Sequence, residues 1–237
     1  MTFRKALGKA GTAARENLFP GLLLQALMLI FLALYLWNEP TKRILADVAQ
    51  IKSQWGYVFA FFSYLVAGAL LPELLRIAFF QRGRATGKNL WNFLTAAPFW
   101  GGTGILVDAF YHLQTAWFGP GDDLRTVLTK MAVDQFIFSP FVADPLIVFY
   151  LHWRDERYRW RAFVEMFRKD FLLENLFPLV VAGWCIWIPG VSLVYFMPPL
   201  LQLPVAVLIQ VFWVLIITTV SELRSRPPGP PVPQALT

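Results

Sequence analysis

Long uncharged stretches are the feature of this sequence that most limits how the chain can fold. Leu18 to Asn38, Ser53 to Pro72 and Asn89 to Val107 contain no charged residue, and Asn175 to Ser221 runs 47 residues without one. A helix needs roughly 20 apolar residues to cross the hydrocarbon core of a bilayer, so each shorter stretch predicts one crossing and the last predicts two. The sequence therefore predicts an all-α fold, a polytopic transmembrane helical bundle.

About six spans are expected, with both termini on the same side. The expected helices cover residues 19–37, 56–80, 91–118, 131–151, 178–197 and 200–221. Prolines at 198 and 199 cannot continue a helix, which predicts a tight hairpin between the last two. We expect a basic N-terminal arm at 1–17, an integral membrane domain at 18–222 and a Pro-rich disordered tail at 223–237.

The composition agrees with a single membrane domain. The chain of 237 residues is 57% hydrophobic and 15% charged, compared with about 25% charged in an ordinary soluble domain. The net charge of +6 comes from basic residues beside the apolar stretches, which favours the lipid bilayer rather than nucleic acid as the partner. One cysteine, Cys185, excludes an internal disulfide and a Cys-based metal cluster within one chain.

The distribution of Lys and Arg predicts the orientation. Sixteen of the 21 basic residues fall in the arm, the second loop with its flank, the fourth loop and the tail, and five fall in the first and third loops. Cytoplasmic loops carry an excess of Lys and Arg, so both termini are expected on the positive, cytoplasmic side.

Several ionisable and polar residues fall within or beside the expected spans, where an isolated charge costs at least about 2.5 kcal/mol. Asp108 and His112 lie four apart on one helical face. With Asp134 and Gln135 they would form an outer polar layer, and Asp144 would approach Glu73 and Arg76 in an inner layer. We therefore predict polar layers at two depths that line a hydrophilic path. The candidates for these layers are Glu73, Arg76, Asp108, His112, Asp134, Gln135 and Asp144.

A purely structural interpretation stays open beside this one. Polar residues in membrane bundles often form hydrogen bonds between helices or neutralised pairs, each contributing about 1 kcal/mol or less. Ala97 and Gly101 have the small-xxx-small spacing of closely packed helices. A hinge beside a conduit is the alternative reading of this glycine-rich segment.

Two loops are amphipathic, and we expect interfacial helices at 44–55 and at 160–171. The second carries the basic residues that we expect at the membrane surface. These residues are Arg157, Arg161, Arg168 and Lys169.

Signatures of an enzyme are weak. There is no Gly-x-Ser-x-Gly turn, and the segment at 83–89 lacks the spacing of a phosphate loop. An aspartyl dyad of Asp108 and Asp134 has no supporting motif, and two histidines at opposite depths do not fit one haem. We expect no catalytic activity, no metal and no cofactor.

One segment resembles a known family. Lys130, Asp134, Gln135 and Pro140 match the K-x-x-x-D-Q-x-x-x-x-P signature of the twenty-two-kilodalton peroxisomal membrane protein family, which includes the mitochondrial Mpv-seventeen protein. The similarity covers about residues 60–222. Asp108 stands where that family usually has His, and Val191, Val194 and Leu203 replace polar residues of its late segment, so the chain resembles a distant member.

The resemblance implies an integral membrane protein that forms a pore or moves small solutes, in a bacterial cytoplasmic membrane or an organelle membrane (mitochondrial inner or peroxisomal). We therefore expect a channel or facilitator for small hydrophilic solutes or metabolites, including anionic ones, with a homo-oligomer as a further possibility. A non-conducting scaffold that recruits lipids or protein partners is the alternative.

Overall fold

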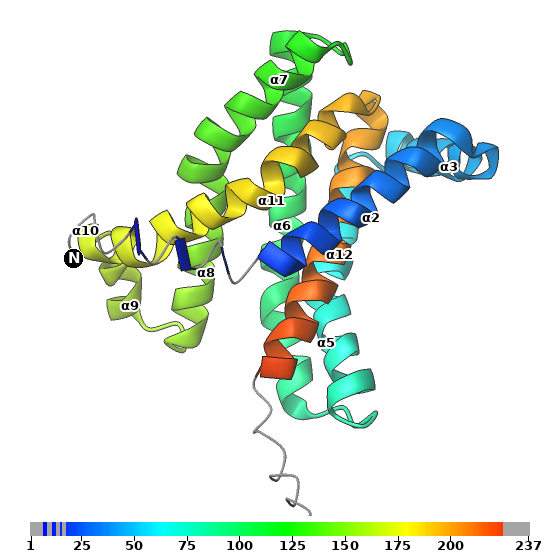
Figure 1. The fold of residues 1–237 in the computed structure, drawn as a ribbon. Helices are drawn as coiled ribbons and strands as arrows, with labels where there is room; N and C mark the ends of the chain where they lie inside the picture. Colours follow the sequence, from blue (N-terminus) through cyan, green and yellow to red (C-terminus); the bar gives the residue numbers. More distant parts are fainter. Residues whose placement is uncertain (1–6, 9–10, 13–14, 16–17, 225–237) are drawn as a thin grey trace, which may run out of the picture.

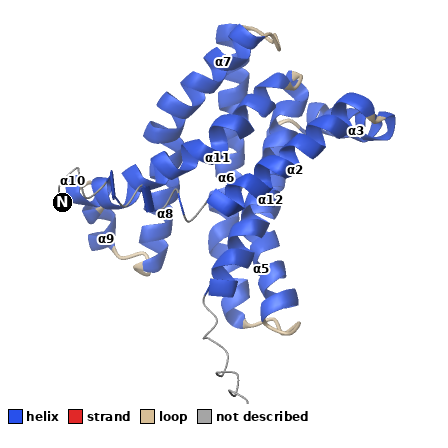
Figure 2. Cartoon of the chain, viewed as in Figure 1, coloured by secondary structure: helices blue, strands red, loops and turns tan. Residues whose placement is uncertain are grey.

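The computed structural model describes residues 7–8, 11–12, 15 and 18–224, and this part of the chain is helical apart from short loops (Figure 2). Elements labelled η are π-helical, with hydrogen bonds from residue i+5 to residue i. The elements are α2 (Leu18–Trp37), α3 (Glu39–Trp55), α4 (Tyr57–Leu65), η1 (Val66–Leu70), α5 (Leu71–Leu75), η2 (Arg76–Phe80), α6 (Gly87–Phe118), α7 (Leu124–Val133), η3 (Asp134–Ala143), α8 (Asp144–Asp155), α9 (Trp160–Glu165), α10 (Lys169–Phe171), η4 (Leu172–Leu176), α11 (Phe177–Phe196) and α12 (Pro199–Arg224).

Several of these elements join end to end into membrane-length helices. Five helices are long and apolar enough to cross a membrane, by length and composition. They cover Leu18–Trp37, Tyr57–Phe80, Leu124–Asp155, Leu172–Phe196 and Pro199–Ile216. With α6 as a sixth, they run alternately up and down in Figure 1, from α2 rising towards α3 to α12 descending. The all-α bundle of about six spans, with both ends on one side, is confirmed.

Helix α6 crosses behind α11 in Figure 1 and carries both buried polar and exposed apolar residues. It packs against α4, η1, α5, α7 and α12. Its polar residues at 89, 108 and 114 are buried. Their burial places these residues against neighbouring helices instead of acyl chains. This arrangement avoids the free-energy cost of exposing a polar group to hydrocarbon.

Prolines account for most of the widened helical turns. Pro72 and Pro178 follow η1 and η4 closely, while Pro140 lies within η3 and Pro145 directly follows it. A proline in a helix has no N–H to donate and its ring clashes with the carbonyl of residue i−4, so a wider turn relieves the contact.

The carbonyls left free by two prolines receive side-chain donors from other segments. In the wide turn of η3, Pro140 would have bonded to the carbonyl of Gln135, and the indole of Trp184 donates to that oxygen at 2.9 Å. Pro189 leaves the carbonyl of Cys185 free, and the amide of Gln25 donates to it at 2.9 Å. Helix α11 therefore continues through Pro189 without a break.

Small residues bring α4 and α6 into close contact, as the spacing of Ala97 and Gly101 predicted. A Cβ on Gly104 would clash with the backbone carbonyl of Ala60, and one on Gly101 would clash with the ring of Phe61. Gly102, on another face of α6, has open space around it. Close packing rather than a hinge is the role of this segment in the structure.

Helices form in both segments that were expected at the interface, and α11 and α12 form the expected hairpin, with differences in extent. Residues 39–55 form α3, but the segment at 160–171 is divided into α9 and α10 by a turn. The fourth span begins at Leu124, seven residues before its expected start, because Asp123 caps α7 by accepting from the amide of Thr126 at 3.1 Å. Hydrogen bonds from the Thr126 hydroxyl and amide hold the pKa of Asp123 below its ordinary value. Of the expected tail at 223–237, the first two residues end helix α12. The remaining residues, 225–237, and most of the N-terminal arm lie outside the described residues.

Replacing Gly104 by Ala is expected to lower the free energy of unfolding by about 1 to 3 kcal/mol, because the methyl group meets backbone that cannot rotate away. Gly102→Ala is the matched control, and it should be neutral or stabilising by up to about 1 kcal/mol, since Ala favours the helix. Denaturation of both variants in detergent micelles, followed by circular dichroism, measures the difference. Equal stabilities of the two variants would contradict the close packing.

Candidate functional site

Most of the buried polar residues form three clusters, and α6 contributes to each of them. The Glu73 cluster comprises Glu73, Arg76, Asn89 and Asn92. The Asp108 cluster comprises Lys52, Asp108 and His112. The Asp134 cluster comprises Gln114, Lys130, Asp134, Gln135, Ser139 and Tyr195.

The Glu73 cluster ties the second span to the start of α6. Glu73 pairs with Arg76 on its own helix and accepts from Asn89 at 2.7 Å and from Asn92 at 3.2 Å. The oxygen of the Asn89 side chain also accepts from the backbone amide of Thr86 at 2.9 Å, which completes a capping box at the start of α6. The Glu73 carboxylate is therefore satisfied by residues of two helices.

The Asp108 cluster contains a wholly buried ion pair. The Lys52 ammonium lies 2.6 Å from the Asp108 carboxylate, and the two side chains are 4% and 3% exposed. His112 Nδ1 lies 2.9 Å from the backbone oxygen of Asp108 and 3.8 Å from its carboxylate. The pair fixes the interfacial helix α3 to α6. Lys52, expected to be a charge of an outer loop, is instead inside the bundle.

The carboxylate of the Asp134 cluster is surrounded by donors. Tyr195 donates to Asp134 at 2.7 Å and Gln135 donates at 2.9 Å, while the Ser139 hydroxyl lies at 3.4 Å. Gln114 donates to the Tyr195 oxygen at 3.3 Å and to the backbone carbonyl of Lys130 at 3.0 Å. Because Tyr195 is wholly buried, this network joins α6, η3 and α11 away from solvent.

Lys130 differs from every other charge in the clusters. Its side chain is 0% exposed, and its ammonium has no hydrogen-bond partner among the described residues. The nearest favourable contact is the ring of Tyr195, whose centroid lies 5.8 Å from the nitrogen, a distance typical of a weak cation–π interaction. The oxygen of the Gln114 side chain is likewise buried without a partner. Two buried polar atoms of the Asp134 cluster, the Lys130 nitrogen and the Gln114 side-chain oxygen, thus lack hydrogen-bond partners among the described residues.

The Asp108 and Asp134 clusters are neighbours within the bundle. Tyr111 follows Asp108 by one turn on α6, and its ring meets that of Tyr195 edge to face at 5.4 Å. The expected outer polar layer is therefore present in part, but Asp108 and Asp134 take separate partners instead of sharing one site.

The expected contact between Asp144 and Arg76 is not found. Arg76 pairs with Glu73, and none of the ion pairs among the described residues includes Asp144. Asp144 is half-buried at the start of α8, whereas Arg76 faces α6 through its pairing with Glu73. The inner layer consequently forms from Glu73, Arg76 and two asparagines of α6, without Asp144.

Sequence reasoning overlooked several members of the clusters. Lys130 stood in the K-x-x-x-D-Q segment but was counted as a loop charge. Lys52 lies in the amphipathic segment before the second span, and nothing in the sequence pattern indicates that it pairs with Asp108. Tyr195 and Gln114 are separated by 81 residues, so only the packing of α6 against α11 and α7 brings them together.

The basic surface residues surround an aromatic cluster beside α8. Arg157, Arg161 and Arg168 are exposed, and so are the apolar Trp160 and Phe167. The side chain of Lys169 lies outside the described residues. Exposed basic and aromatic side chains together are typical of a helix at the membrane interface.

Within the described part of the chain, no three His, Cys, Asp or Glu side chains gather closely enough to hold a metal ion. The chemistry available in the clusters is hydrogen bonding and charge. In the Asp134 cluster the Lys130 ammonium and the Gln114 side-chain oxygen have no hydrogen-bond partner among the described residues.

Breaking the buried pair is expected to destabilise the fold strongly. Lys52→Met leaves the Asp108 charge buried alone and should cost about 3 to 5 kcal/mol, while the double variant Lys52→Met/Asp108→Leu should cost less than Lys52→Met alone. Lys42→Met, on the same helix, removes a pair with Glu39 that is exposed and should change stability by less than about 1 kcal/mol. Denaturant titrations in micelles give these values, and a Lys52→Met variant as stable as Lys42→Met would refute the assignment.

The sequence and fold were compared with known proteins. No family model matches the chain, and neither the curated proteins nor the solved structures give a significant match. What the protein does must therefore be argued from the three polar clusters of a membrane bundle.

Proposed function

We propose that this integral membrane protein is a channel or facilitator for small hydrophilic solutes, and that it favours anions. The observation that carries the proposal is the Lys130 ammonium, wholly buried and without a hydrogen-bond partner among the described residues. A charge in such surroundings is costly, so it needs water or an anion to stabilise it. A passing solute would supply that partner.

The arrangement of the clusters along α6 supports a path at this helix. Asn89 and Asn92 lie near its first turn, Asp108 lies beyond its middle, and Gln114 lies near its end. From Asn89 to Gln114 the helix rises by about 37 Å, which exceeds the roughly 30 Å of a hydrocarbon core. The polar side chains of one helix thus reach across the membrane.

In the proposed mechanism the structure represents a closed state. Tyr195, Asp134 and Gln114 are bonded to one another, so a solute that reaches Lys130 must replace some of these bonds. Polar groups along a path lower the cost of desolvating the solute, and a single ammonium gives preference to anions. The basic inner surface would raise the local concentration of anions.

The resemblance to the twenty-two-kilodalton peroxisomal membrane protein family remains a proposal that agrees with this function. Lys130, Asp134 and Gln135 of the shared segment gather around Tyr195. The carbonyl freed by Pro140 is bonded by Trp184. The residues of the segment therefore act as one structural unit in this chain.

Protein in liposomes is expected to accelerate the efflux of small anions relative to neutral sugars. Lys130→Met should lower anion efflux by about tenfold, equivalent to roughly 1.4 kcal/mol in the barrier. The same variant should be more stable than the natural protein by at least about 1 kcal/mol, because an unpartnered buried charge is removed. Lys42→Met, which removes an exposed charge from α3, is the control and should leave efflux unchanged.

Two outcomes would argue against a facilitator. Natural protein that passes no solute of a broad panel would exclude it, and undiminished anion efflux through Lys130→Met would exclude the role of Lys130. A gain in stability together with lost efflux separates a functional role from a structural one, because a residue needed only for folding would not stabilise the protein when removed.

A non-conducting scaffold is the second candidate, and the aromatic cluster beside α8 favours it. The side-chain polar atoms of Tyr150, Trp153 and Tyr158 are buried without hydrogen-bond partners among the described residues. They lie beside the exposed Arg157 and Arg161. A lipid headgroup or a partner protein would satisfy them. In this case charge reversal at the two arginines would abolish function, whereas substitutions of Asp134 or Asp144 would only lower stability.

A further inference from the structure

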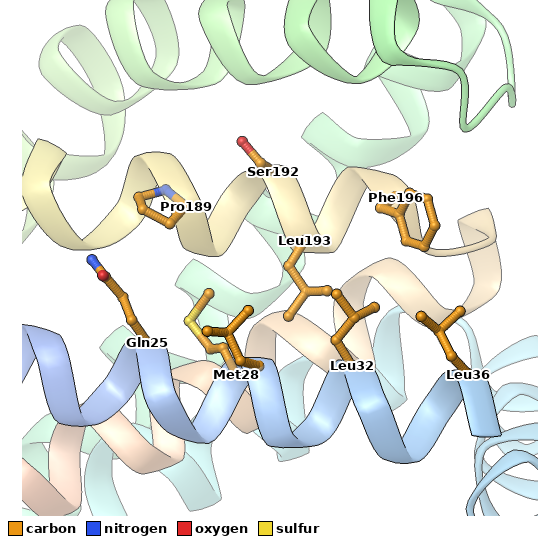
Figure 3. Close-up of a pocket in the computed structure, with 9 residues that line it drawn as sticks. Gln25, Met28, Leu32, Leu36, Pro189, Ser192, Leu193 and Phe196 are labelled. Atoms are coloured by element: carbon orange, nitrogen blue, oxygen red, sulfur yellow. The ribbon is translucent and has the colours of Figure 1, made fainter. Parts of the chain in front are cut away.

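An apolar groove lies between α2 and α11. Its cavity has a volume of about 370 Å³. Met28, Leu32 and Leu36 line it from α2, while Leu193 and Phe196 line it from α11 (Figure 3). In Figure 3 Leu193 points towards α2 between Met28 and Leu32. The groove has the size and apolar lining of a ligand site.

A second cavity of about 200 Å³ continues the groove towards the start of α2. Gln25 lines both cavities, and its hydrogen bond to the Cys185 carbonyl fixes the spacing of the two helices at their junction. Gly21 allows α11 to approach here, since a Cβ would lie 3.3 Å from Ile186. The two cavities are therefore adjacent, with Gln25 at their junction.

The second cavity has a positive charge among its lining residues. Arg15 lines it together with Leu18 and Leu22. The start of α2 is on the side of the membrane with most basic residues, so Arg15 is at headgroup depth. One leaflet of the hydrocarbon core is about 15 Å thick, and about 15 Å along α2 leads from Leu18 to Met28. An acyl chain held at Arg15 would thus fill the smaller cavity and enter the larger one.

We propose that the α2–α11 groove is a binding site for an anionic phospholipid of the inner leaflet, with the headgroup phosphate at Arg15 and one acyl chain along Leu22, Gln25 and Met28. The charge at the end of an otherwise apolar site selects this occupant over a neutral lipid.

Cys185 provides a natural probe of the site. It is the single cysteine of the chain, it is exposed and it lines the second cavity. The full-length protein is labelled there with bimane and reconstituted with brominated phosphatidylglycerol or brominated phosphatidylcholine. Bromine quenches bimane on contact, so the relative quenching reports which lipid occupies the groove.

Quenching should require about fivefold less phosphatidylglycerol than phosphatidylcholine, in keeping with the attraction of one basic residue for an anionic lipid. Arg15→Gln should abolish this preference. The matched control is Arg157→Gln, which removes the same charge from the same membrane side but far along the chain from the groove, and it should keep the preference.

The remaining outcomes would overturn the proposal. Equal quenching by the two lipids in the natural protein would indicate ordinary lipid contact at an apolar surface. Loss of the preference in both Arg15→Gln and Arg157→Gln would indicate general electrostatic attraction. Absence of quenching by either lipid would indicate that protein, such as a second copy of this chain, covers the groove.

Discussion

The structure depends on one constraint, which is that a polar group surrounded by lipid must find its partner inside the protein. The buried pair of Lys52 and Asp108 shows the constraint for side chains. The bonds from Trp184 and Gln25 to carbonyls freed by prolines show it for the backbone. Water is not present in the bilayer core to form hydrogen bonds with these groups, so the protein must supply the partners. In each of these bonds the partner comes from another helix, and the bond therefore also joins two helices.

Helix α6 buries one polar face because of this constraint. Its neighbours supply the partners for Asn89, Asp108 and Gln114, while apolar residues such as Leu94 and Leu113 are exposed on the helix. Glycines on the face towards α4 permit the close approach that this burial needs. The same polar residues that force α6 into the interior would give a solute its path, so stability and the proposed transport draw on one set of side chains.

Two features of the described chain are the places where a solute and a lipid are proposed to bind. The Lys130 ammonium lacks a hydrogen-bond partner among the described residues, and the groove between α2 and α11 is an apolar cavity that continues towards Arg15. A protein that only needed to fold would gain stability by filling both. We propose a mobile polar solute at Lys130 and a lipid in the α2–α11 groove. Because the two ligands differ in chemistry, the two proposals can be tested independently.

The sequence by itself determined the fold class, the approximate span ends and the candidates Glu73, Asp108, Asp134 and Gln135, because hydrocarbon thickness and the cost of buried charge act on local stretches of sequence. Only the tertiary structure decided the partners. Lys52 and Lys130 read as loop charges yet lie inside the bundle, Asp144 does not meet Arg76, and Tyr195 reaches Asp134 across 61 residues. The physical reason is that pairing depends on which helix faces pack together. Helical periodicity shows on which face of its helix a residue lies, but it does not show which other helix packs against that face.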